Sequence, residues 1–282
     1  MPGMLFVVAT PIGNLEDITV RALRVLREVS LIAAEDTRRT AHLLARHAIA
    51  TPTTSLHEHN EVRKAPSLIA RLQAGDTIAL VSDAGTPTIS DPGGRLIRAA
   101  IDAGIRVEPI PGPSAVLTAL AASGLPTDTF LFLGFPPTRA KDRKLWFARL
   151  KRAGGTVVFF EAPHRIRRTL VELQELVGNC EVAIGRELTK THEQLVRGPI
   201  IKAISELKDE RGEFTVVANI GLITEISELN RSLEPSDATL LCEITENRSP
   251  SRRGAVAALA RKYQMLPNKV YEAIERAKKS GV

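Results

Sequence analysis

Short apolar runs alternate with helical segments five times between residues 5 and 122 of this 282-residue chain. Such alternation predicts a parallel sheet with helices on both faces, because right-handed crossovers place the helices there. We expect extended segments at residues 5–9, 31–34, a short stretch running into 55–60, 78–81 and 106–110. The first helix is expected at residues 18–28, with Asp17 as the cap, and the second at 40–47. Further helices are expected in a Lys-, Arg- and Leu-rich stretch to 73, at 92–103 with Asp91 as the cap and Pro92 as the first helical residue, and at 116–122.

Three of these strands end in loops rich in glycine and proline, at residues 10–17, 82–87 and 111–115. Ligands of open α/β sheets bind beyond the carboxyl ends of the strands, so the three loops should gather around one small molecule, with Asp83 as a polar contact. Each loop alone could equally be an ordinary turn from strand to helix. None of them has the glycine spacing of a dinucleotide-binding or Walker A loop, so a ligand other than a phosphate-led nucleotide is favoured.

The rest of the chain predicts a second α/β unit and a helical tail. Apolar strands are expected at 130–135, 156–161, 181–184 and 214–220, with helices near 139–152 and up to 177, a turn at 197–199 and a sheet that is not wholly parallel. Residues 222–237 are polar and predict a linker. The helical segments at 252–262 and 268–279 resemble a helix-turn-helix, or equally a hairpin that packs on the body or on a second subunit. The predicted domains are therefore 1–123, 124–222 and 236–282.

Composition limits the class of protein. Hydrophobic residues make up 44% of the chain, but no uncharged apolar run approaches the roughly 20 residues of a membrane span, so no membrane association is expected. The first residues lack a basic signal-peptide start and lead directly into a strand, which favours a cytoplasmic protein. The two cysteines, Cys180 and Cys242, have no paired spacing, so neither a disulfide framework nor a metal site is expected.

The positive charge of the chain is concentrated in two places. The net charge is +6, and residues 236–282 hold nine Lys or Arg against five Asp or Glu. A second cluster comprises Arg139, Lys141, Arg143, Lys144, Arg149, Lys151 and Arg152. Such clusters indicate contacts to phosphates. The alternative for the second cluster is a solvated helix face, with Leu145, Trp146 and Leu150 inward.

Seven short motifs occur in order at residues 9–14, 35–38, 57–60, 82–87, 111–115, 159–165 and 186–190. Through these motifs the sequence closely resembles the ribosomal RNA small subunit methyltransferase I family of the tetrapyrrole methylase superfamily. The resemblance spans residues 4–220. Leu56, where an aromatic residue is expected, and Gly185, in place of alanine, are small departures. The resemblance implies two α/β domains of the tetrapyrrole methylase type, with S-adenosylmethionine in the cleft between them.

The resemblance also implies an activity and its partners. The reaction would be methylation of a cytidine 2′-hydroxyl in the decoding region of 16S rRNA, either free or in the assembled 30S particle, by a homodimer. The cofactor contacts carried over by motif are Thr10, Pro11, Asp83, Ala84, Gly85, Thr86, Pro87, Ser114, Ala115 and Phe160, and by weaker similarity Val217 and Ala218. The alternatives are a same-fold methylase acting on a tetrapyrrole, and a noncatalytic nucleic-acid-binding protein with a ligand-sensing body.

Methyl transfer from a sulfonium is an in-line displacement that requires alignment of donor and acceptor and no metal. A ribose hydroxyl is a weak nucleophile, so a general base would help. We expect Glu187 or Lys190 near the acceptor hydroxyl, although the two could simply form an ion pair. The candidates for substrate binding are Arg38, His57, His164, Arg165 and Arg186, of which the arginines suit phosphates. His57 and His59 could suggest a metal pair, but hydrogen-bonded histidines are favoured because no third ligand has a fitting spacing.

Overall fold

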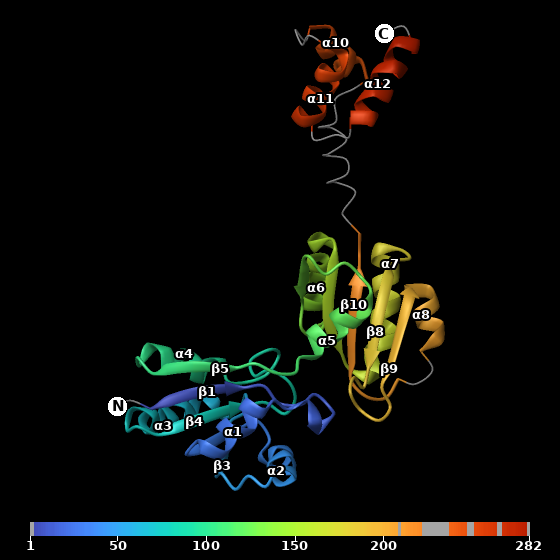
Figure 1. The fold of residues 1–282 in the computed structure, drawn as a ribbon. Coiled ribbons are helices and arrows are strands. Elements are labelled where there is room, and N and C mark those ends of the chain that lie inside the picture. Colours follow the sequence, from blue (N-terminus) through green and yellow to red (C-terminus); the bar gives the residue numbers. More distant parts are fainter. Residues whose placement is uncertain (1–2, 208–209, 222–236, 247–250, 264–266, 281–282) are drawn as a thin grey trace. The chain divides into compact units, whose positions relative to one another are not determined.

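A computed structural model describes residues 3–207, 210–221, 237–246, 251–263 and 267–280 (Figure 1). The chain divides into two compact units, Met1–Gly221 and Leu222–Val282. The expected linker at 222–237 falls almost entirely outside the described residues. Among the described helices, none combines the length and the apolar character needed to cross a bilayer.

The first unit begins with a five-stranded sheet whose strands are all parallel, as predicted. Its strand order is β3-β2-β4-β1-β5. The strands are β1 (Met4–Val8), β2 (Leu31–Ala34), β3 (Thr53–Ser55), β4 (Thr77–Val81) and β5 (Arg106–Ile110). Every residue of β2 is buried, because helices cover both faces of the parallel sheet and side chains on either face are shielded from solvent.

Helices cover both faces of this sheet. α1 (Val20–Glu28) and α2 (Thr37–Arg46) pack on one face, and α3 (Glu61–Gln73) and α4 (Gly94–Asp102) pack on the other. Asp17 lies in the short helix η1 (Leu15–Asp17), so its expected capping role is wrong. Thr19 caps α1 instead, accepting a hydrogen bond from the backbone N–H of Ala22.

The expected start of α4, with Asp91 as its cap and Pro92 as its first residue, is also wrong. α4 begins at Gly94, because Thr88, Ser90 and Gly93 all have positive φ angles and the chain cannot be helical there. Gly93 has no side chain to cap the helix. The buried carboxylate of Glu61 in α3 does so, accepting from the backbone N–H groups of residues 95 and 96.

A second sheet is mixed, as predicted, with the order β6-β7-β10-β8-β9. Its strands are β6 (Phe130–Phe132), β7 (Thr156–Glu161), β8 (Glu181–Arg186), β9 (Gln194–Pro199) and β10 (Phe214–Asn219). β10 is antiparallel to both of its neighbours. The sequence predicts only a turn at 197–199, but β9 is an edge strand, where a terminal proline costs no ladder hydrogen bond.

The two faces of the second sheet are covered differently. α6 (Ala140–Ala153), α7 (Ile166–Val177), which follows the short helix η2 (Pro163–Arg165), and α8 (Ile200–Glu206) pack on one face. The other face is covered by α5 (Ala115–Ser123), which contacts Val158, Ala183 and Val217. α5 follows the last strand of the first sheet but packs on the second (Figure 1). The boundary at residue 123 stays a prediction.

The described part of the second unit consists of three helices around their own apolar core. They are α10 (Asp237–Glu246), α11 (Arg252–Lys262) and α12 (Pro267–Ser280), of which the last two are predicted and the first is not. Leu240 of α10 packs with Leu259 of α11 and with Val270 and Ile274 of α12.

Candidate functional site

The three glycine- and proline-rich loops are joined by backbone hydrogen bonds and by the hydroxyl groups of Thr10 and Thr86. Thr10 and Gly85 exchange two such bonds of 2.9 and 3.0 Å, although they lie 75 residues apart in the chain. The Thr10 hydroxyl donates to the carbonyl of Ser82 at 3.1 Å, and that of Thr86 donates to the carbonyl of Pro113 at 3.3 Å. The predicted gathering of the three loops at one sheet edge is confirmed.

These loops form one wall of a pocket of about 410 Å³. From the predicted cofactor contacts, the lining includes Asp83, Ala84, Gly85, Thr86, Ser114, Ala115 and Phe160. The facing wall comes from the second sheet and includes Phe160 and its cross-strand partner Thr215. The pocket therefore lies between the two sheets of the first unit.

The other predicted cofactor residues are placed outside the lining described for this pocket. Thr10, in the first loop, is buried, Pro11 lines a smaller neighbouring pocket, and Pro87 follows Thr86. Val217 lies under α5, and Ala218 faces the opposite side of the sheet, against α6–α8. Side chains in a strand alternate, so Thr215 shares the face of Val217 and is the β10 residue next to Phe160.

Two carboxyl groups that sequence reasoning did not assign to the cofactor, Glu35 and Asp91, line the pocket together with Asp83. The Glu35 carboxylate accepts a hydrogen bond from the backbone N–H of Asp83 at 3.2 Å. The Asp83 carboxylate in turn accepts one from the backbone N–H of Asp36 at 2.9 Å. Burial raises the pKa of Glu35, and the charge of Asp83 adds to this effect. Burial and the charge of Glu35 raise the pKa of Asp91 to about 6. A cation in the pocket would relieve this mutual repulsion.

The raised pKa of Asp91 predicts a pH-dependent stability. A carboxyl group that binds its proton more tightly in the folded state destabilises that state as pH rises from the unfolded value near 4 to the folded value of about 6. Asp91→Asn should therefore increase the free energy of unfolding by about 1–3 kcal/mol at pH 8 and by much less at pH 4. Urea denaturation at both pH values measures this, and an equal change at the two would contradict the raised pKa.

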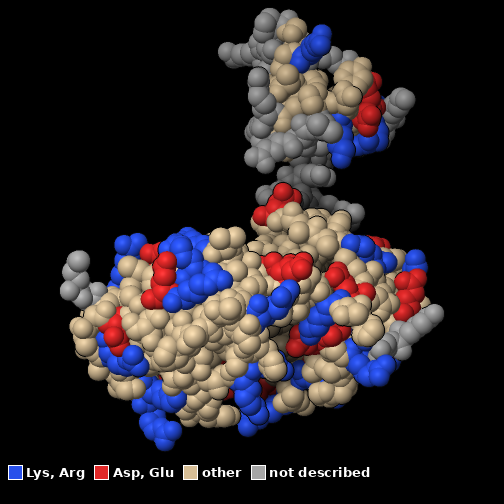
Figure 2. Space-filling view, turned by 60° about the horizontal axis from the view of Figure 1, so that its bottom comes forward, with Lys and Arg blue, Asp and Glu red and all other residues tan. Residues whose placement is uncertain are grey.

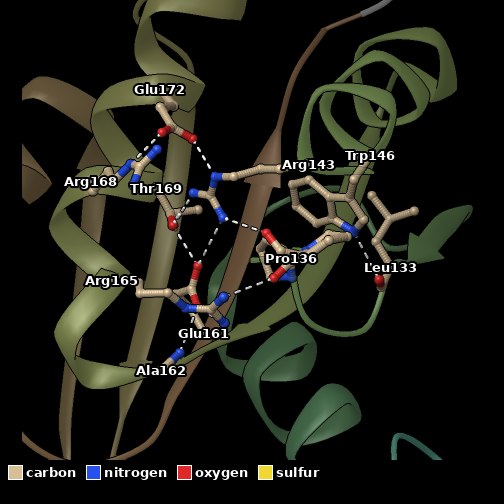
Figure 3. A network of polar contacts seen from close by, with 11 residues as sticks. Leu133, Pro136, Arg143, Trp146, Glu161, Ala162, Arg165, Arg168, Thr169 and Glu172 are labelled. Atoms are coloured by element: carbon tan, nitrogen blue, oxygen red, sulfur yellow. Dashed lines mark hydrogen bonds and ion pairs between the residues drawn. The ribbon is translucent and has the colours of Figure 1, made fainter. Parts of the chain in front are cut away.

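Aromatic rings and a buried polar network form the other end of the pocket. The rings of Phe135 and Phe160 lie 5.3 Å apart, and both line the cavity. Next to them, the fully buried carboxylate of Glu161 pairs with Arg165 at 2.7 Å (Figure 3). It also accepts hydrogen bonds from the Thr169 hydroxyl and from the backbone N–H of Ala162. Arg143 lies 3.9 Å from the same carboxylate. The network fixes the backbone of residues 161–163, which lines the pocket.

Arg143 is not part of an exposed basic surface, contrary to the sequence-based expectation. Its side chain is 7% exposed and bonds Glu172 and Thr169, each at 2.7 Å. It lies on the buried face of α6 with Trp146 and Leu150, whereas Leu145 is exposed. The other basic residues of the cluster, Arg139, Lys141, Lys144, Arg149, Lys151 and Arg152, are exposed.

The predicted catalytic pair lies in a tightly held loop. Glu187 and Thr189 have positive φ angles, a strained backbone for residues other than glycine. The loop fits between two glycines: a Cβ on Gly13 would lie 2.5 Å from Lys190, and one on Gly212 would lie 2.5 Å from Glu187. The backbone N–H of Asn14 donates to Thr189 at 3.0 Å. The first loop therefore holds Lys190 in place.

The charges around Lys190 argue against a role as a base. Its ammonium group donates to Glu187 at 3.0 Å and to Glu213 at 3.1 Å. Burial opposes the charge, but these carboxylates outweigh it and raise the pKa of Lys190. Burial likewise opposes the charge of Glu187, but the backbone N–H of Glu213 and the ammonium group lower its pKa. Both groups are held in their charged forms, so Lys190 is a hydrogen-bond donor at neutral pH.

The residues predicted to bind substrate do not come together in one place. Arg38 has a side chain that is 88% exposed and pairs with Asp36 at 2.7 Å. Arg165 belongs to the Glu161 network, and His164 beside it is exposed. Arg186 donates to the carbonyl of Arg211 at 2.7 Å. These substrate roles stay predictions.

His57 lies apart from the pocket, at the end of β3. Its ring centroid is 6.0 Å from that of His59, and its Nδ1 atom is buried without a hydrogen-bond partner among the described residues. Its backbone N–H donates to Asn60 at 2.9 Å. The role of His57 in substrate binding also stays a prediction.

Known proteins similar to this chain share one description. A Vibrio cholerae protein is 42% identical over 95% of this chain and 93% of its own length, and a Halalkalibacterium halodurans protein is 50% identical over 76% and 75%. Each is named ribosomal RNA small subunit methyltransferase I. The chain belongs to this family. The resemblance seen in the motifs is thereby confirmed. Residues 4–204 also match the tetrapyrrole (corrin/porphyrin) methylase family model.

Solved structures show the same fold for this member of the methyltransferase I family. A diphthine synthase structure aligns with a TM-score of 0.63 at 14% identity, covering 82% of this chain and 95% of that one. A Thermus thermophilus uroporphyrin-III C-methyl transferase complexed with S-adenyl homocysteine aligns with a TM-score of 0.54 at 17% identity, covering 77% and 98%. The predicted fold class, α/β of the tetrapyrrole methylase type with two sheets and C-terminal helices, is confirmed.

Proposed function

We propose that this protein transfers a methyl group from S-adenosylmethionine to small-subunit (16S) rRNA, at the 2′-hydroxyl of a cytidine in the decoding region. It belongs to a methyltransferase family whose members are named for small-subunit ribosomal RNA. The observation that carries the proposal is the pocket between the sheets, which combines closely spaced carboxylates, bare loop backbone and two aromatic rings. The nucleotide and the 2′ position rest on the resemblance.

The residues of the pocket fit this cofactor. When bound, S-adenosylmethionine supplies an activated methyl group on a cationic sulfur. Glu35, Asp83 and Asp91 offer negative charge to a cation, and two of them have raised pKa values that a cation would lower. Phe135 and Phe160 offer an apolar surface to a flat ring. The carboxylates and rings together suit a ligand with a charged end and an aromatic end.

The protein's own contribution is alignment, desolvation and proton removal. Positive φ angles constrain the loops at 85–93 and 187–190, which contribute to the large pocket and to its smaller neighbour, so the protein offers donor and acceptor fixed surroundings. The acceptor hydroxyl would lose its proton during methyl transfer, so a base must lie near it. Asp83 and Glu213 are the carboxylates placed to receive the proton, because each lines both the large pocket and its smaller neighbour.

The surface charge supports an RNA acceptor over a small macrocycle. Lys and Arg side chains are numerous on the face shown in Figure 2, where Asp and Glu lie among them, so the positive charge is distributed and not one continuous stripe. Six exposed basic side chains belong to α6 and the residue before it, and Arg253 and Lys269 are exposed in the second unit. A tetrapyrrole also carries carboxylates but is small, so in the pocket it would leave these side chains, which line neither the large pocket nor its smaller neighbour, without an anion to bind.

The experiment is methyl transfer from labelled S-adenosylmethionine to small subunits that lack the modification. We expect label in 16S rRNA, in a nucleoside that resists alkaline cleavage because its 2′-oxygen is methylated. Label only in a porphyrinogen would favour the tetrapyrrole alternative. Cofactor binding without transfer to naked rRNA, 30S particles or porphyrinogen would favour a noncatalytic binding protein. Comparing naked rRNA with 30S particles identifies the preferred substrate.

We also propose that the protein works as a cytoplasmic homodimer, as the resemblance implies. A groove between α3 and α4, lined by Val62, Ala65, Pro66, Ile69, Arg95 and Ala99, offers an apolar surface to a second copy. Val62 is 65% exposed there. Light scattering of the purified protein measures the mass, and a monomer at micromolar concentration would contradict the proposal.

A further inference from the structure

A smaller pocket of about 180 Å³ adjoins the proposed cofactor pocket. Both pockets are lined by Ile12, Arg39, Asp83, Ala84 and Glu213. Lys190 lines only the smaller one, together with Pro11, Gly13, Leu15, His42 and Leu43. A molecule in the smaller pocket would therefore lie next to a molecule in the larger one, beside Asp83 and Ala84.

The smaller pocket carries cationic and hydrogen-bonding groups on two sides. Arg39 and His42 are three residues apart in α2, so both project from one face of that helix. On the other side, the Lys190 ammonium group is fixed by Glu187 and Glu213. Ile12, Leu15 and Leu43 supply apolar contacts between these two sides. The pocket thus suits a ligand with an anionic edge and a hydroxyl-bearing body.

Arg39 is placed to accept an anionic ligand. Its side chain is 63% exposed, and one terminal nitrogen lies 3.5 Å from the Asp83 carboxylate, a long ion pair. The neighbouring Arg38 is different, because two of its nitrogens bond the Asp36 carboxylate at 3.0 and 2.7 Å. A guanidinium with one long contact has most of its N–H donors available for a phosphate, to which it can donate from two nitrogens.

We propose that the smaller pocket binds the ribose and the adjacent phosphate of the acceptor nucleotide. Arg39 and His42 bind the phosphate, and Lys190 donates a hydrogen bond to the ribose oxygen that receives the methyl group. This proposal rests on the proposed function and deepens it, since it assigns the RNA acceptor a place beside the cofactor. Arg39 and His42 replace Arg38 as the residues of α2 that contact RNA.

The test is the binding of a 16S rRNA fragment or small subunit in the presence of S-adenosylhomocysteine, measured over a range of salt concentrations. Arg39→Ala should weaken binding by about 10-fold and reduce the slope of log affinity against log salt by about 0.7, the effect of one lost phosphate contact on single-stranded RNA. His42→Ala should weaken RNA binding by about 3- to 10-fold, as expected for one lost hydrogen bond. It should leave S-adenosylhomocysteine affinity, measured by calorimetry, within about 2-fold, because His42 lies outside the large pocket.

The matched control is Arg46→Ala, which removes an exposed positive charge from the same helix but lines neither pocket. Its RNA affinity and salt slope should match those of the wild type. Equal affinities for all three variants would overturn the acceptor pocket while leaving the methyltransferase activity intact. Weakened RNA binding by Arg39→Ala and His42→Ala in an enzyme that methylates no rRNA would support the pocket and refute the proposed reaction. A wild type that does not bind RNA would refute both.

Discussion

Replacing Arg143 with methionine should lower the free energy of unfolding of the first unit by about 3–5 kcal/mol. The side chain is nearly fully buried, and its guanidinium group serves Glu172, Thr169 and Glu161 at once. Methionine can fill much of the space of the alkyl chain, so the main loss is electrostatic. It would leave the fully buried carboxylate of Glu161 with Arg165 as its only remaining cationic partner among the described residues.

Chemical denaturation followed by the fluorescence of Trp146, the only tryptophan of the chain, measures this loss. Trp146 reports on the relevant core, because its indole N–H donates to the carbonyl of Leu133 at 3.0 Å beside the network. Arg149→Met is the matched control, since Arg149 is exposed on the same helix and should change stability by less than about 0.5 kcal/mol. A loss of less than about 1 kcal/mol for Arg143→Met would mean that the network contributes little.

Replacing Asp83 with asparagine should weaken the binding of S-adenosylmethionine by about 10- to 100-fold, a loss of about 1.4–3 kcal/mol. Asparagine keeps the shape and can still accept the hydrogen bond from the backbone N–H of Asp36. The change therefore removes a negative charge from the cofactor pocket, together with the long ion pair of 3.5 Å to the exposed Arg39. The affinity for S-adenosylhomocysteine, whose sulfur is neutral, should fall less, because attraction to the sulfonium is the interaction that is lost.

Calorimetry with both ligands tests this expectation. Asp76→Asn is the matched control, because Asp76 and Asp83 flank opposite ends of β4. Asp76 pairs with Arg71 at 2.6 Å on the surface, so its replacement should leave cofactor affinity unchanged. Equal losses for the cationic and the neutral ligand would show that Asp83 acts by shape or hydrogen bonding and not by charge. Unchanged affinity for both would remove Asp83 from the site.

Local patterns were sufficient to predict the parallel sheet. β2 has the predicted boundaries, because an apolar run between turn residues specifies a buried strand by itself. β5 has them as well, although it is an edge strand with polar residues and a proline, because Gly104 and Pro111 mark its two ends. The loops were also predictable, since glycine and proline at strand ends signal a change of direction. The errors at the ends of helices have a different origin. Asp91 and Pro92 form a standard helix start in isolation, but the positive φ angles of Thr88, Ser90 and Gly93 are set by packing that no local pattern shows.

The site was only partly predictable, because its walls come from distant segments. Glu35 belongs to a recognised motif and directly follows β2, which pairs with β4, so strand order would have placed it near Asp83. Thr215 could have been found from Phe160 by strand alternation once the pairing of β7 with β10 was known. The burial of Arg143 could not be predicted, since its partners Glu161 and Glu172 lie in β7 and α7 and the charge pattern of α6 alone resembles a solvated face.

Helix α5 determines where this protein can be cut. A fragment ending at residue 123 would carry Val116, Ala119 and Leu120 without the strands that bury them, and the remaining fragment would expose Val158, Ala183 and Val217. Both pieces would be prone to aggregation, because each would present a contiguous apolar patch to water. A truncation made for expression should therefore end or begin before α5, within residues 111–114. A chimaera that exchanges one half with a relative should have its junction in the same segment.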